Sequence, residues 1–235
     1  MKNNLTFLIL FLTQILVGQR LTKNGDKILG STEDDAIFQS VQAINGNIYA
    51  VGETYSLTKG GSDGYLVILN PLGNEIVEKR FGGERDDAFY SIAALSDGTF
   101  ALAGRTKSKG NGKFDAWVVY VDKDGNRVRE DRVLGTSADD EFRVAVASED
   151  GSVFFAGTRN EQKDADIWIV KELSGKTVFE KQVSLGHYVK NVKSGVSDTE
   201  GGLVLLGDTK RTDAVKGDDI WVSQIDKNGR THDLQ

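Results

Sequence analysis

The sequence contains no cysteine and a single proline, Pro71. The absence of cysteine excludes disulfide bridges, thiolate metal sites and a lipid-modified cysteine. Stability must therefore come from burial of apolar surface, and a chain of 235 residues is long enough to bury a sufficient core. With 27 glycines against one proline, we expect turns built on glycine and strands that pack closely.

The sequence also lacks the features that mark several classes of function. Its net charge is −6, which disfavours nucleic acid as a partner, because a basic surface is expected of proteins that bind it. The two histidines have no zinc-type spacing, and neither a phosphate loop nor a nucleophile–base set is present. We therefore expect no cofactor, no bound metal and no catalytic residues, and we predict that the protein is not an enzyme.

One N-terminal segment has the pattern of a targeting signal. Lys2 supplies a positive start, an apolar stretch runs from residue 5 to residue 17, and Gly18 is a small residue at a suitable cleavage point. The stretch is shorter than the about 20 apolar residues that a transmembrane helix needs. Residues 1–18 are thus a predicted signal peptide. Residues 19–235 are then exported, to the periplasm, the outer membrane or the cell exterior, with no membrane span of their own.

A short phrase recurs about every 50 residues and marks a tandem repeat. It consists of an aspartate, a small or apolar residue and an aromatic residue, and it contains all three tryptophans: Asp63-Gly64-Tyr65, Asp115-Ala116-Trp117, Asp166-Ile167-Trp168 and Asp219-Ile220-Trp221. The repeat divides the mature chain into four units, at about 28–80, 81–132, 133–182 and 183–235.

Every unit contains the same parts in the same order. A glycine and an acidic pair precede a short apolar strand, and a tight turn such as Asp97-Gly98 leads into a second apolar strand. The strand with the Asp-x-aromatic phrase follows, and a charged, alternating strand such as residues 127–133 closes the unit. No segment of useful length has helical periodicity. Each unit is therefore predicted to be four antiparallel strands, which form one blade of a β-propeller.

The mature chain is predicted to be a single all-β domain, a propeller of four four-stranded blades. Residues 24–29 and 228–234 both resemble the last turn and strand of a unit, which favours closure of the ring where the two chain ends meet. Two alternatives are an open β-solenoid of four units and a half-ring completed by dimerisation.

The repeats resemble those of secreted and cell-surface proteins of Bacteroidota. The matching residues are Gly82-Gly83, Asp86-Asp87, Gly104-Arg105-Thr106 and Asp115-Ala116-Trp117. The resemblance covers the mature chain and implies a propeller-like fold, but no particular activity. The fourth unit departs from the pattern, with residues 185–189 in place of the acidic pair.

The repeated aspartates and tryptophans are interpreted as scaffold. An aspartate in a turn commonly accepts hydrogen bonds from nearby backbone amides, and a tryptophan beside an apolar strand commonly packs between sheets. The predicted structural residues are Asp34, Asp35, Asp63, Asp86, Asp87, Asp115, Trp117, Asp139, Asp140, Asp166, Trp168, Asp219 and Trp221.

Residues that vary between units on the same face are better candidates for recognition. The predicted partner-binding residues are Tyr55, Lys107, Arg159, His187 and Arg211. The predicted function is a non-catalytic scaffold that binds a protein partner in the cell envelope, such as an outer-membrane complex. The first alternative is a carbohydrate-binding propeller that uses aromatic and acidic side chains. The second is a polysaccharide-acting enzyme with two carboxylates in the central channel.

Overall fold

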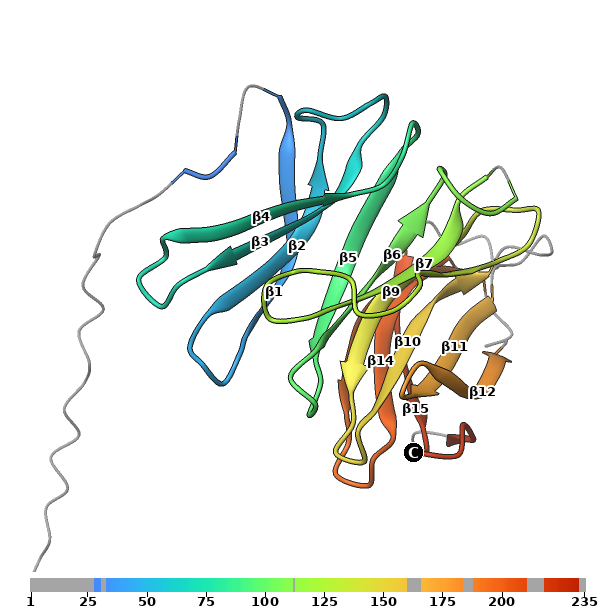
Figure 1. Cartoon of the computed structure of the whole chain (residues 1–235). Helices are drawn as coiled ribbons and strands as arrows, with labels where there is room; N and C mark the ends of the chain where they lie inside the picture. The colour runs from blue at the N-terminus through green and yellow to red at the C-terminus, as the bar shows by residue number, and fades with distance from the viewer. Residues whose placement is uncertain are drawn as a thin grey trace, which may run out of the picture.

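The computed structural model describes residues 28–30, 33–111, 113–159, 166–183, 188–210 and 218–232. Over these ranges the chain is all β and contains no helix, hence none that could cross a membrane. Four sheets of four antiparallel strands follow one another in chain order, from the blue first sheet to the orange and red fourth sheet in Figure 1. The prediction of four four-stranded propeller blades is confirmed. The predicted closure between the two chain ends is not observed, because over the described residues the first and fourth sheets share no strand pairing and no apolar cluster.

The sheets correspond to the four repeat units. The first comprises β1 (Asp35–Gln42), β2 (Ile48–Thr54), β3 (Asp63–Leu69) and β4 (Glu75–Phe81). The second comprises β5 (Asp87–Ala94), β6 (Phe100–Thr106), β7 (Asp115–Val121) and β8 (Arg132–Leu134). The third comprises β9 (Asp140–Ala147), β10 (Ser152–Arg159), β11 (Asp166–Leu173) and β12 (Lys176–Val183). The fourth comprises β13 (Tyr188–Ser197), β14 (Leu203–Lys210), β15 (Asp218–Ile225) and β16 (Thr231–His232).

Glycine is required at two kinds of position in each unit. Gly98 lies in the β5–β6 turn with a φ of 82°, a left-handed conformation that favours glycine. Gly104, near the end of β6, allows a close approach, because a Cβ there would lie 1.9 Å from the carbonyl oxygen of Ala88. This approach coincides with a bulge in β5 between Phe89 and Ser91. The repeated glycines therefore set the turns and the bend of the innermost strand.

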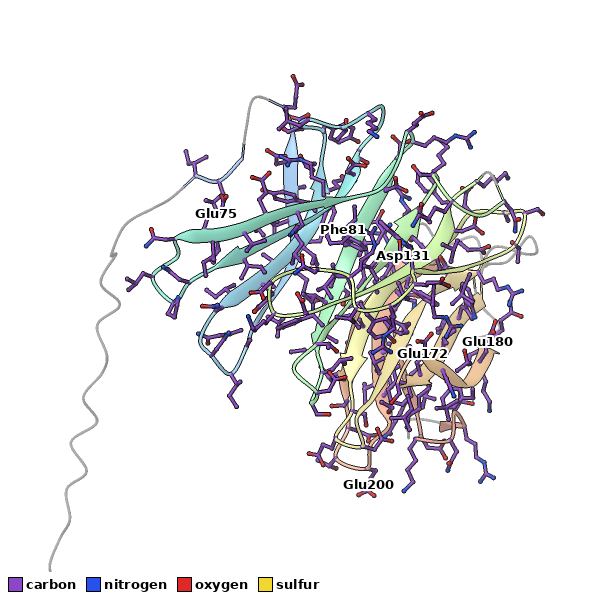
Figure 2. All side chains as sticks on the ribbon, viewed as in Figure 1. Glu75, Phe81, Asp131, Glu172, Glu180 and Glu200 are labelled. Atoms are coloured by element: carbon purple, nitrogen blue, oxygen red, sulfur yellow. The ribbon has the colours of Figure 1, made fainter. Side chains whose placement is uncertain are left out.

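Apolar side chains fill the space between successive sheets. One cluster joins the first and second sheets, a second joins the second and third, and a third joins the third and fourth. Phe81, labelled in Figure 2, belongs to the first cluster, where Phe89 stacks on Trp117 with ring centroids 4.5 Å apart. Phe142 and Trp168 make the equivalent contact at 4.7 Å in the next cluster. The tryptophans of the second, third and fourth units thus lie in the clusters that join each of these blades to the one before it.

Candidate functional site

The innermost strands of the four sheets surround a cavity of about 230 Å³. A chain of hydrogen bonds ties three of these strands together beside it. The hydroxyl of Ser91 donates to Gln39 Oε1 at 2.5 Å, and the amide of Ala145 donates to the Ser91 hydroxyl at 2.8 Å. These bonds fix β1, β5 and β9 side by side next to the cavity.

A charged and aromatic cluster, called the axial site below, gathers there from three blades. It consists of Glu53, Tyr90, Arg105, Glu141 and Arg143. The Arg143 guanidinium lies 3.8 Å from the centre of the Tyr90 ring, and the Arg105 guanidinium lies 5.6 Å from it. Glu141 is between the two arginines, 2.6 Å from Arg143 Nε and 3.5 Å from Arg105 Nη1. The carboxylate and the two guanidiniums therefore hold one another in place.

The electrostatics of the axial site favour a neutral tyrosine and a charged arginine. Burial raises the pKa of Tyr90 to about 12, although Arg105 and Arg143 act in the opposite direction. Burial alone would lower the pKa of Arg143, but its hydrogen bond to Glu141 and the negative charges of Glu141 and Glu53 outweigh this and raise it. At neutral pH the Tyr90 hydroxyl is thus a donor and Arg143 a permanent cation.

A second cavity of about 340 Å³ opens beside the axial site. Arg105, Glu141 and Arg143 of the axial site line this second cavity, and Arg143 also lines the first. Phe114 forms part of its wall, with the Arg105 guanidinium stacked 3.9 Å from the ring centre. Asn191, from the innermost strand of the fourth blade, adds an amide. Among the described residues, the buried Arg105 Nε has no hydrogen-bond partner. This wall therefore offers planar polar groups and an aromatic ring.

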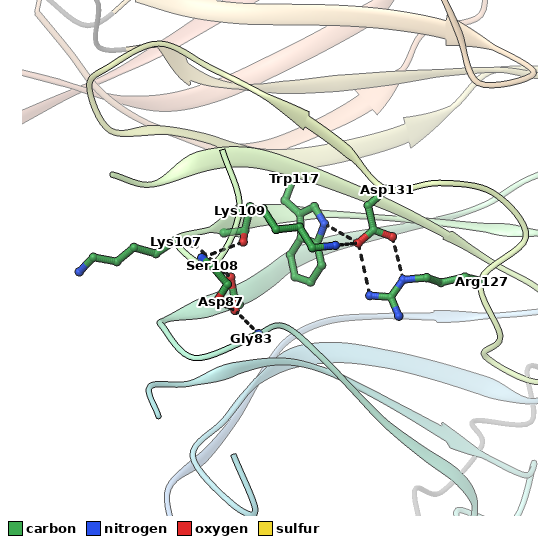
Figure 3. A network of polar contacts seen from close by, with 9 residues as sticks. Gly83, Asp87, Lys107, Ser108, Lys109, Trp117, Arg127 and Asp131 are labelled. Atoms are coloured by element: carbon green, nitrogen blue, oxygen red, sulfur yellow. Dashed lines mark hydrogen bonds and ion pairs between the residues drawn. The ribbon is translucent and has the colours of Figure 1, made fainter. Parts of the chain in front are cut away.

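The aspartates of the repeat brace the loops around this face. The carboxylate of Asp87 accepts hydrogen bonds from the amides of Gly83, at 3.0 Å, and Lys107, at 3.1 Å, and from the Ser108 hydroxyl at 2.6 Å (Figure 3). The Asp87 amide donates to the carbonyl of Ser62 in the preceding blade at 2.7 Å. Asp87 therefore connects a blade to its own second loop and to its neighbour.

The later copies of the acidic positions make similar contacts. Asp140 accepts from the amide and hydroxyl of Thr136, and Asp115 accepts from the amide of Asn111 at 2.8 Å. Asp139 accepts from the Phe114 amide at 3.2 Å. Burial raises the pKa of Asp115, and the nearby charge of Asp140 adds to the effect.

The remaining predicted structural aspartates differ in their surroundings. Burial raises the pKa of Asp63, to which the charge of Asp87 contributes. Asp86 lies 3.6 Å from the ammonium group of Lys107. Asp34 and Asp219 are exposed, Asp35 is half-buried, and Asp166 begins β11.

The three tryptophans are buried, and each indole N–H has an acceptor. Trp117 Nε1 donates to Asp131 Oδ2 at 3.2 Å, and Lys109 and Arg127 also bind Asp131 (Figure 3). Trp168 Nε1 donates to Glu180 at 3.0 Å, and Trp221 Nε1 to the carbonyl of Asp208 at 3.1 Å. These acceptors were not predicted from the sequence. Two of them, Asp131 and Glu180, are acidic residues of the charged outermost segments, and that position in the sequence could have suggested their role.

The predicted partner-binding residues do not form one cluster. Tyr55 is 47% exposed in the loop after β2. Lys107 lies 5.2 Å from the Phe114 ring, close to the second cavity. Arg159 bonds Glu180 at 3.0 Å and covers the Trp168 ring. His187 and Arg211 lie outside the described residues, and the partner-binding role of all five residues stays a prediction.

Sequence comparisons identify no relative, while structural comparisons identify the fold. No family model and no curated protein matches the chain. Hydrazine synthase of Kuenenia stuttgartiensis matches with a TM-score of 0.54 at 16% identity, over 79% of this chain and 50% of that one. Streptogramin B lyase matches with a TM-score of 0.49 at 13% identity, over 86% and 69%. The chain thus spans half the length of the hydrazine synthase chain, and the likeness shows a propeller fold.

The prediction that the chain is not an enzyme is contradicted by these comparisons. The similar structures include glycoside hydrolases, a sialidase and a member of the GH130 family of mannoside phosphorylases, the last with a TM-score of 0.43 at 11% identity over 86% of this chain and 70% of that one. The sequence argument failed because it relied on contiguous motifs. On a propeller, groups that act together come from separate strands, so no linear spacing reveals them.

Proposed function

We propose that this chain is a carbohydrate-recognising β-propeller whose ligand binds at the axial site and the second cavity beside it. The observation that carries the proposal is the wall of the 340 Å³ cavity, where the planar groups of Arg105, Glu141, Arg143 and Asn191 lie beside the Phe114 ring. Neighbouring sugar hydroxyls are best bound by planar side chains that donate or accept two hydrogen bonds, and an aromatic ring supports the apolar face of a sugar.

Several features make this wall suitable for a neutral or acidic sugar. Arg105 and Arg143 are stacked on Phe114 and Tyr90, so little side-chain entropy is lost when they bind a ligand. The guanidinium groups of Arg105 and Arg143 offer donors, and Glu141 offers carboxylate oxygens as acceptors. The buried tryptophans do not reach this surface, so we propose a single site in place of equivalent sites on every blade.

The test is a binding screen of the purified chain against neutral and acidic oligosaccharides, followed by calorimetry with the best ligand. Glu141→Gln and Phe114→Ala are each expected to weaken binding at least about tenfold, because the first removes a hydrogen bond to a charged group, worth about 1.5–3 kcal/mol, and the second removes the aromatic support for the sugar. The control Arg85→Gln, at an exposed position outside the cavity, should bind normally. Chromatography of the incubated ligand measures cleavage in the same samples. Equal binding by all variants would contradict the proposal.

The same experiment separates the carbohydrate proposal from a protein partner in the cell envelope. That second proposal is supported by the exposed Tyr55 ring and the surface position of Lys107. If no oligosaccharide binds and an envelope protein co-purifies unless Tyr55 and Lys107 are replaced, the protein-partner proposal replaces the carbohydrate one.

We also propose that the chain belongs to the Bacteroidota-type repeat proteins and is exported after removal of residues 1–18. Support for the family comes from the motif residues of the second unit, residues 82–87, 104–106 and 115–117, whose glycines and aspartates make the contacts that the repeat requires. Support for export comes from the N-terminal apolar pattern, which lies outside the described residues. Sequencing the N-terminus of the protein recovered from its cells tests both the cleavage point and the single domain 19–235.

A further inference from the structure

The contact between neighbouring blades uses the same positions three times. In the third contact, the face of the third blade that is turned toward the next blade in the chain packs against the fourth blade. This face of any blade is called its outward face below. The residues Phe154, Ala156, Ile167 and Ile169 of the third blade's outward face have no exposed surface. The fourth blade supplies the complementary half, in which the innermost strand contributes Val192.

The outward face of the fourth blade carries the same apolar pattern without a cover. The glycines and tryptophans align the two blades, because Gly157 pairs with Trp168 and Gly207 pairs with Trp221. Leu206, Ile220 and Val222 therefore take the places of Ala156, Ile167 and Ile169. They are 36%, 79% and 45% exposed, whereas their counterparts are completely buried. This surface, residues 206, 220 and 222, is called the open fourth face below.

The first blade carries the complementary half, but only its innermost strand is uncovered, because Ala50, Tyr65 and Val67 are 6%, 5% and 1% exposed. In every blade one apolar residue of the innermost strand pairs with the glycine of the second strand, and these residues are Ile37, Phe89, Phe142 and Val192. Phe89, Phe142 and Val192 are at most 1% exposed between blades, but Ile37 is 49% exposed. The neighbouring Phe38 lines the central cavity instead, with its ring centre 5.3 Å from that of Tyr90.

The two uncovered halves do not meet within one chain. Over the described residues, no apolar cluster joins the first and fourth blades, and no strand pair between them packs as the other neighbouring blades do. Ala50, Tyr65 and Val67 of the first blade form a cluster of their own. At each end of the array of blades, the chain therefore exposes apolar positions that are buried where blades meet inside the chain. These positions are Ile37 at one end and the open fourth face at the other.

We propose that a second copy of this chain supplies the missing halves. The open fourth face of each copy packs against Ile37 of the other, which continues the interface already made three times inside the chain. Because each copy carries one half of each kind, two such contacts close a symmetric dimer and leave no half exposed. Burial of these large apolar side chains provides the driving force.

Light scattering during size-exclusion chromatography of residues 19–235 tests the proposal. We expect twice the monomer mass for the wild type across the micromolar range. Val222→Lys and Ile37→Glu should each raise the dimer dissociation constant about 100-fold or more, because each places a charge in an apolar contact. The control Leu72→Lys, at an 86% exposed position in the β3–β4 turn, should leave the dimer intact. Circular dichroism verifies that each variant is folded.

Mixing the two interface variants provides a second measurement. The mixed dimer has one wild-type contact and one contact between the introduced lysine and glutamate, so it should form although each variant alone is monomeric. A monomeric wild type, a filament, or variants that dimerise like the wild type would each overturn the proposal. A mixture that stays monomeric would overturn it as well.

Discussion

Glu172 offers a sharp test of how the second and third blades are joined. Its side chain has no exposed surface, and it lies on β11 (Figure 2). Its Oε2 accepts a hydrogen bond of 2.7 Å from the Tyr120 hydroxyl, and its Oε1 forms an ion pair with Arg132. Both partners belong to the second blade, and burial together with the charge of Glu172 raises the pKa of Tyr120, so the phenol stays a donor.

Replacing only Glu172 leaves the Tyr120 hydroxyl without its acceptor and Arg132 without its counter-charge, although Arg132 still donates to Thr177 Oγ1 at 3.0 Å. Removal of one side of a buried ion pair typically costs about 3–5 kcal/mol, so Glu172→Met should lose about that much unfolding free energy. For a domain of this size each kcal/mol corresponds to about 2–4 °C, which predicts a Tm lower by about 6–20 °C. Urea unfolding followed by tryptophan fluorescence measures the free energy directly.

Removing the whole polar group should cost much less. In the triple variant Tyr120→Phe, Arg132→Met, Glu172→Met, no buried polar atom is left unpaired, and we expect a loss within about 2 kcal/mol of the wild type. The effects are then strongly non-additive, as expected for residues in direct contact. If Glu172→Met loses less than about 1 kcal/mol, or the triple variant loses as much as the single changes together, the reasoning about this contact is refuted.

Three further predictions concern single side chains. Burial would raise the pKa of Asp131, but hydrogen bonds from Arg127 and Lys109 lower it below its ordinary value of 3.8. Asp131→Asn should therefore lose about 1–3 kcal/mol of unfolding free energy at pH 7. In urea titrations this difference from the wild type should shrink as the pH falls below 3.8, and a difference that is independent of pH would contradict the reasoning. Gly104→Ala should destabilise the protein by more than the about 1 kcal/mol expected for Gly98→Ala. The reason is that the new Cβ at position 104 meets the Ala88 carbonyl oxygen, whereas a Cβ at position 98 has open space around it. Thermal melts compare the two variants, and equal losses would argue against the close approach. Lys171, which is buried and paired with Asp150 at 3.0 Å, should tolerate Lys171→Met with a change in unfolding free energy within about 1 kcal/mol, because the desolvation cost of the cation is removed and Asp150, whose side chain is 55% exposed, stays hydrated; chemical denaturation would reject this if the loss exceeded about 3 kcal/mol.

The sequence predicted the repeat and the blade because both depend on local patterns. Turn glycines such as Gly98, alternating strands and the Asp-x-aromatic phrase recur at fixed spacing, and four copies of one pattern reinforce one another. The Asp87 carboxylate also accepts hydrogen bonds from nearby amides, the contact that turn chemistry favours.

The axial site could not be found in this way. Glu53, Tyr90, Arg105, Glu141 and Arg143 come from three units and share no motif, so their meeting depends on how the sheets turn about a common axis. The prediction that the chain is not an enzyme relied on linear spacing in the same way, and groups that converge in space leave no trace in linear spacing.

The sequence by itself determined the four-stranded unit, its number of copies and its apolar faces, because hydrogen-bonded strands and alternating burial are properties of short segments. Only the tertiary structure decided which faces are covered and which charges meet. Ile37 and Val192 occupy the same position in the repeat, yet one is half exposed and the other is buried. That difference depends on whether another blade stands next to the position, which the pattern within one unit does not encode.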